Sequence, residues 1–107
     1  MNARDEVLTA ANLRVARLAD VSAACDRCGA NIFQLVLQDI IDVAYSLTEE
    51  EAERRLVRLE RKLLAVSVST EAVTELSRAV SAYREAVNEW AEKVGLLIKE
   101  RGDRWQG

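Results

Sequence analysis

Residues 73–97 read VTELSRAVSAYREAVNEWAEKVGLL. Within this stretch an apolar side chain recurs every three or four positions, at Val73, Leu76, Val80, Tyr83, Val87, Trp90, Val94 and Leu97. This spacing follows the turn of an α-helix and places the eight side chains on one face. Because an apolar face of this length is unstable in water, the stretch predicts a long amphipathic helix that packs against other helices.

The composition of the whole chain agrees with an all-helical protein. The chain has 107 residues, the size of one ordinary domain, and it contains no proline and only four glycines. A sheet protein needs more of these turn residues. Half of the residues are apolar and 31% are charged, a balance typical of a globular rather than a disordered chain. We therefore predict one all-α domain over residues 1–107.

Apolar spacing predicts an antiparallel bundle of three to four helices, over about residues 3–28, 32–46, 49–66 and 70–101. Gly29 stands where a helix C-cap belongs, and Asn31 with Gln34 three positions later is typical of a capping box that starts a new helix. The alternative is one unbroken helix over about residues 3–46, because an isolated glycine costs only about 1 kcal/mol relative to alanine.

Polar side chains mark the starts of the other predicted helices. Asn2 can cap the first helix, and Thr48 with Glu51 forms a strong capping box for the third. Either Ser69 or Thr70 can cap the last helix. Because the loop before the last helix is short, the third and fourth helices are expected to be antiparallel neighbours.

The helices differ in length and in the amount of apolar surface. The first has a thin seam at 3–4 spacing, formed by Leu8, Ala11, Val15, Leu18, Ser22 and Cys25. The second is apolar on most of its circumference, so it must be covered on more than one side. The last would be about 48 Å long at 1.5 Å per residue, roughly twice the length of the second. Helices this unequal leave apolar surface exposed in a monomer, and this surplus predicts a bundle completed by symmetric dimerisation.

Charge and targeting signals limit which classes of partner and which cellular compartment are expected. The 15 basic and 18 acidic residues give a net charge of −3, and they are spread evenly, so we expect neither nucleic-acid nor membrane-surface binding. The most apolar stretch, residues 32–47, contains Asp39 and Asp42 and is too short to span a bilayer. No secretory signal is visible at the start of the chain, which predicts a cytoplasmic protein.

Two cysteines form the one motif with a chemical name, Cys25-Asp-Arg-Cys28-Gly29. The pair lies at the end of a predicted helix, where the helix dipole opposes thiolate formation, so redox catalysis is disfavoured. A four-thiolate zinc site needs two more ligands, and the chain has no histidine and no further cysteine. Structural thiols are the favoured interpretation. The alternatives are a zinc ion shared between two subunits and a regulatory disulfide.

Asp39 and Asp42 place two carboxylates on adjacent helical turns, a pattern that Mg²⁺-binding bundles also use. The segment from Asp39 to Leu47 resembles the second acidic motif of the all-helical nucleotide pyrophosphohydrolases of the MazG type. That resemblance implies a Mg²⁺-dependent phosphoanhydride hydrolase in which glutamates of the third or fourth helix complete the metal site. It covers nine of 107 residues, and the family's first acidic motif has no counterpart here. The alternative is that both carboxylates face solvent or pair with arginines of the third helix.

A polar strip on the second predicted helix suggests a third kind of site. It consists of Asn31, Gln34, Gln38, Asp42 and Tyr45. Buried amides need hydrogen-bond partners, so such a strip lies either at the surface or around a bound ligand inside the bundle. The second case, with Asn31, Gln38 and Asp42 lining a pocket, would suit a natural or an engineered bundle, because the regular caps and seams after Thr48 are also typical of idealised designs.

The surplus of apolar helix surface is the strongest of these signals. The sequence therefore predicts a non-enzymatic, helical protein–protein interaction or assembly module that needs no cofactor. Its expected partner is another protein or a second copy of itself, as a homodimer. The small-molecule or metal pocket and the Mg²⁺-dependent hydrolase stay open as alternatives.

Overall fold

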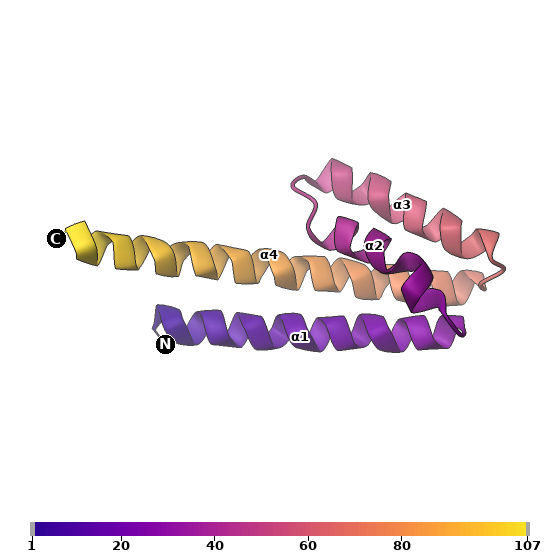
Figure 1. Ribbon diagram of the computed structural model, residues 1–107, viewed down its shortest axis with the longest axis horizontal. Coiled ribbons are helices and arrows are strands. Elements are labelled where there is room, and N and C mark those ends of the chain that lie inside the picture. The colour runs from indigo at the N-terminus through magenta and orange to yellow at the C-terminus, as the bar shows by residue number, and fades with distance from the viewer. Residues whose placement is uncertain (1, 107) are drawn as a thin grey trace.

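The computed structural model describes the backbone of residues 2–106 and the side chains of residues 2–102. Figure 1 shows helices that follow one another along the chain with short connections. No strand is present in the described part, so the predicted all-α fold is confirmed. The four helices are α1 (Ala3–Cys28), α2 (Ile32–Ala44), α3 (Glu49–Ala65) and α4 (Thr70–Gln106). The last helix is five residues longer than predicted, because it continues through Gly102, and an isolated glycine costs a helix only about 1 kcal/mol relative to alanine.

The chain breaks between α1 and α2, as the glycine predicts. Gly29 adopts φ 120° and ψ 172°, a backbone conformation open essentially to glycine alone. The predicted capping box at Asn31 is wrong. Asn31 lies in the left-handed region with φ 68°, and its side chain makes no capping hydrogen bond. An N-cap side chain reaches the first free N–H groups from an extended backbone, and the left-handed conformation removes that geometry.

Replacing Gly29 by alanine tests this break directly. We expect Gly29→Ala to destabilise the protein by about 1–3 kcal/mol, because alanine must adopt a backbone conformation that a side chain disfavours. The matched control is Asn31→Gly in the same loop, which should be neutral or slightly stabilising because glycine tolerates φ 68°. Urea unfolding followed by circular dichroism measures both. A neutral Gly29→Ala would mean that α1 and α2 form one continuous helix.

The other helix starts are capped as predicted. The Asn2 side chain accepts a hydrogen bond from the Asp5 amide at 2.9 Å, and Thr48 Oγ1 accepts one from the Glu51 amide at 3.1 Å. At the start of α4 the cap is Ser69, whose hydroxyl accepts from the Ala72 amide at 3.2 Å. These bonds satisfy N–H groups that the helix itself leaves free.

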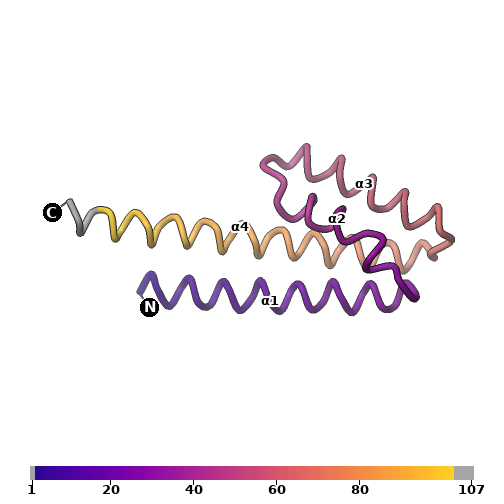
Figure 2. The backbone as a smooth tube through the Cα atoms, in the orientation of Figure 1, coloured from indigo at the N-terminus to yellow at the C-terminus, as the bar shows by residue number. Residues whose placement is uncertain are grey.

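The helices form two pairs of unequal length. The long helices α1 and α4 lie antiparallel, and the short hairpin of α2 and α3 covers only the half that contains the end of α1 and the start of α4 (Figures 1 and 2). The molecule measures 59 × 24 × 19 Å and has a radius of gyration of 16.4 Å, against about 13 Å for a compact domain of this length. This elongated shape arises because α2 and α3 cover only half of the α1–α4 pair. One end of the molecule therefore contains four helices and the other end only two.

The core lies at the four-helix end. Its largest fully buried side chains come from every helix: Val21, Cys25, Val36, Ile40, Val43, Leu59, Leu63, Leu76 and Val80. The predicted face of α4 is confirmed over its first part, since five of the eight predicted seam positions, those from Val73 to Val87, are buried. Trp90, Val94 and Leu97 are only half-buried, because they lie at the two-helix end where α2 and α3 no longer cover α4.

The predicted seam of α1 is largely wrong. Cys25 is its one buried member among the six, whereas Leu8, Val15 and Leu18 are 53%, 63% and 39% exposed. The face that α1 buries contains instead Ala10, Val21, Ala24 and Cys25. Small residues such as alanine let the two helix backbones approach closely, so they can form the contact while the larger apolar side chains lie beside it. Apolar spacing identified an apolar stripe but not the face that the neighbouring helix covers.

Candidate interaction surface

The predicted polar strip of α2 lies at the surface. Asn31, Gln34 and Gln38 are exposed, Tyr45 is 48% exposed, and Gln38 Nε2 donates to Asp42 Oδ1 at 2.9 Å. A groove of about 490 Å³ lies elsewhere, between α3 and α4. Its lining contains none of the five strip residues, so the structure does not gather the strip around this space.

The two predicted metal-binding carboxylates have different partners. Asp39 is 8% exposed, and its Oδ2 lies 3.0 Å from Lys62 Nζ on α3. The carboxylate of Asp42 is bound by Gln38 on its own helix, while its backbone carbonyl accepts from Arg55 Nη1 at 2.9 Å. Among the side chains that the structure describes, no three carboxylates or thiols gather in a way that could hold a metal ion.

The two cysteines are free thiols in the interior and at its edge. Cys25 is 1% exposed, and Cys28 Sγ donates to the Ala72 carbonyl of α4 at 3.8 Å. Burial, with smaller contributions from the Cys28 and Asp26 charges, raises the pKa of Cys25 from its ordinary 9.0 to about 11. Burial also raises the pKa of Cys28. A zinc site shared between subunits would require Cys25 to leave the core, so this geometry agrees with structural thiols.

A cluster that the sequence interpretation missed connects the helices where the two-helix end begins. The Arg14 guanidinium of α1 lies 4.1 Å from the centre of the Trp90 ring of α4, close enough for a cation–π contact. Tyr83 of α4 is 7% exposed, and burial, with a smaller contribution from the neighbouring Tyr45, raises its pKa to about 12. Arg14 lies outside the predicted seam of α1, and no local pattern pairs it with Trp90.

Exposed and half-buried apolar residues lie together at the two-helix end. We call this surface the open face and define it by Leu8, Ala11, Val15 and Leu18 of α1 with Ala91, Val94, Gly95 and Ile98 of α4. Leu8, Val15 and Ile98 are each more than half exposed, at 53%, 63% and 65%. Large apolar side chains grouped in this way are typical of a surface that binds a partner.

Helical spacing places the α4 stripe of the open face on the side that α2 and α3 cover at the other end. Arg84 of α4 faces this hairpin, because its Nη1 lies 2.6 Å from Glu49 Oε1 and its Nη2 donates to the Ser46 carbonyl at 3.5 Å. Continuing from Arg84 at 3–4 spacing leads through Val87 to the α4 members of the open face. On α1, Ala11 and Leu18 lie fourteen and seven residues before Cys25, which belongs to the same core cluster as residues of α2. Leu8 and Val15 lie on the adjoining face of α1, together with the exposed Ser22.

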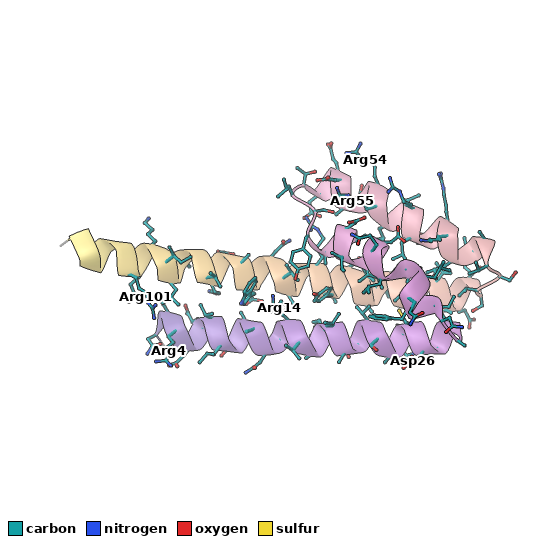
Figure 3. All side chains as sticks on the ribbon, in the orientation of Figure 1. Arg4, Arg14, Asp26, Arg54, Arg55 and Arg101 are labelled. Atoms are coloured by element: carbon teal, nitrogen blue, oxygen red, sulfur yellow. The ribbon has the colours of Figure 1, made fainter. Side chains whose placement is uncertain are left out.

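The loop between α2 and α3 borders the open face. Figure 1 shows this loop at the end of the short hairpin that points toward the two-helix end. It contains Leu47, which is 93% exposed, the largest exposed fraction among the large apolar side chains that the structure describes. In Figure 3 the labelled Arg14 lies between α1 and α4, while Arg4 and Arg101 lie at the far tip of the two-helix end. The open face is thus bounded by an apolar loop and a charged tip.

Comparison with models of protein families, with curated protein sequences and with solved structures finds no match to this chain. In the part of the chain that the structure describes, each helix is either too short or too polar to cross a lipid bilayer.

Proposed function

We propose that this protein is a non-enzymatic helical module that binds another protein through the open face. The observation that carries the proposal is the group of half-exposed leucine, valine and isoleucine side chains on two adjacent helices, at the end of the molecule that the α2–α3 hairpin leaves uncovered. A partner that covers these side chains removes apolar area from water, which stabilises the complex by roughly 25 cal/mol per Å² before the cost of association.

The contacts around the other candidate residues favour an interaction module over the two alternatives. A ligand pocket needs polar groups that point into an enclosed space, but Gln38 and Asp42 bond to each other on the surface of α2. A Mg²⁺-dependent hydrolase needs carboxylates that converge on one position, but Asp39 pairs with Lys62 across the α2–α3 contact.

A matched pair of double variants tests the proposed function. We expect Leu8→Glu with Val15→Glu to abolish partner binding, because it places charge at two positions of the open face. The control is Val57→Glu with Leu64→Glu, which changes a valine and a leucine that are similarly exposed on α3, at 44% and 50%, and have the same seven-residue spacing. All four positions are exposed, so the free energy of unfolding of each variant should lie within about 0.5 kcal/mol of that of the unsubstituted chain.

Sedimentation equilibrium and affinity capture with the full chain as bait provide the measurements. The proposal predicts a complex, with itself or with another protein, that the control variant retains and the open-face variant loses. A chain that stays monomeric at high micromolar concentration and captures no protein would contradict it, and so would a complex that the open-face variant forms equally well.

A further inference from the structure

We propose that the partner on the open face is a second copy of this chain, related by a two-fold axis, so that the two copies form a central four-helix bundle from two α1 and two α4 helices. This inference rests on the proposed function and specifies the partner. It also assigns a use to the apolar stripe of α1 that the folded subunit leaves exposed.

The shape of the subunit is complementary to itself. The α2–α3 hairpin lies mainly beside α4 at one end of the α1–α4 pair and is absent at the other end, so the outline of the subunit has a step there (Figure 2). Filling this step takes two antiparallel helices of about the same length, and the two-helix end of a second copy supplies them. In a two-fold arrangement the same surface of both copies forms the contact. The tip of each copy then reaches the α2–α3 loop of the other, where Leu47 is 93% exposed.

The estimated area of the step lies close to the lower limit for a specific dimer. The two-helix end is about 20 Å wide, from two helices of about 10 Å each, and about 25 Å long at 1.5 Å per residue. Its flat projection is therefore about 500 Å² per subunit, and interdigitating side chains bury more accessible surface than the flat projection. Specific interfaces begin at roughly 600 Å² per subunit, and the contact with the α2–α3 loop adds to this area.

The α4 stripe of the open face suits close helix packing around a symmetry axis. Its positions Ala91, Gly95 and Ile98, and Gly102 at the next step of the same spacing, carry no charge, so identical stripes can meet there without repulsion between like charges. Apart from the chain neighbours and the nearby backbone of α4 itself, no described atom lies within 4 Å of a Cβ built on Gly95 or Gly102. Glycine is less favourable than alanine inside a helix, and the part of the subunit that the structure describes gives these two glycines no packing reason. Close approach of a second helix supplies one.

The test measures the association of the full chain and of three double variants from 1 to 200 µM by sedimentation equilibrium. We expect the natural chain and the Val57→Glu, Leu64→Glu control to dimerise. Leu8→Glu with Val15→Glu and Leu8→Lys with Val15→Lys should each weaken dimerisation by more than about 100-fold, because two charges per subunit become buried without partners. An equal mixture of the Glu and Lys variants should regain a dimer, because every introduced charge then faces its opposite.

The outcomes separate this inference from the proposed function. A natural chain that is monomeric at 200 µM overturns the second-copy inference, and so does a Glu variant that dimerises as well as the natural chain or a Glu and Lys mixture that stays monomeric. If the monomeric chain still captures another protein that the Glu variant loses, the proposed function stands and only its partner changes. If the monomeric chain captures no other protein, both the second-copy inference and the proposed function are wrong.

Discussion

Leu59→Ala should destabilise the protein by about 2–4 kcal/mol, because truncating a fully buried leucine removes its packing contacts and leaves a cavity. Leu59 has no exposed surface and lies in the cluster to which all four helices contribute. Partial collapse of the site around alanine is restricted, since α2, α3 and α4 all supply large buried neighbours there.

Leu64→Ala on the same helix is the matched control for this prediction. Leu64 is 50% exposed, so its truncation should change the free energy of unfolding by about 0.5 kcal/mol or less. Urea denaturation gives both values, and measurement at several protein concentrations separates the stability of the single chain from any contribution of the proposed dimer. A loss below about 0.5 kcal/mol for Leu59→Ala would mean that the four-helix end does not have the packed core described above.

Cys25 should react with iodoacetamide at pH 8 about 100 times more slowly than an unstructured cysteine. The thiolate is the reactive form, and a rise of the pKa from 9.0 to about 11 lowers its population about 100-fold at this pH. Because the folded state raises the pKa, the rate should keep increasing about tenfold per pH unit above pH 9, where a free thiol levels off. Between pH 9 and pH 11 the unfolded chain releases the Cys25 proton more readily than the folded chain, so stability falls over this range.

Single-thiol variants separate the two cysteines. Cys28→Ala reports on Cys25, and Cys25→Ala reports on Cys28, whose smaller burial should allow faster alkylation. Both thiols should react like a free cysteine once the protein is unfolded in urea. If Cys25 in the folded protein were alkylated as fast as an unstructured cysteine, its buried position would be contradicted. If a chelator removed the protection from alkylation, a metal-bound pair of cysteines would be favoured instead.

Most of the secondary structure could be predicted from the sequence. The caps at Asn2, Thr48 and Ser69 and the break at Gly29 depend on interactions within three or four residues, so their signals are visible in a short stretch of chain. Asn31 is the exception. Its side chain suggested an N-cap, but the backbone turn that Gly29 begins placed it in the left-handed region, where the same side chain cannot cap.

The candidate site was much less predictable. The notion of surplus apolar surface came from the sequence, but its position depends on how far the α2–α3 hairpin extends over α1 and α4. The pairing of Asp39 with Lys62 across 23 positions and the contact of Arg14 with Trp90 have no local signature. Both arise from helices that meet only after folding.

By itself the sequence determined that this chain is helical, where its helices begin and break, and that α4 has one continuous apolar face, because caps, glycine and 3–4 spacing act through the nearest turns of the chain. Only the tertiary structure decided which face of α1 is buried. Alanines let α1 approach α4 closely, and this contact leaves Leu8, Val15 and Leu18 exposed beside it. That choice depends on the free energy of packing between helices far apart in the sequence, and it created the open face.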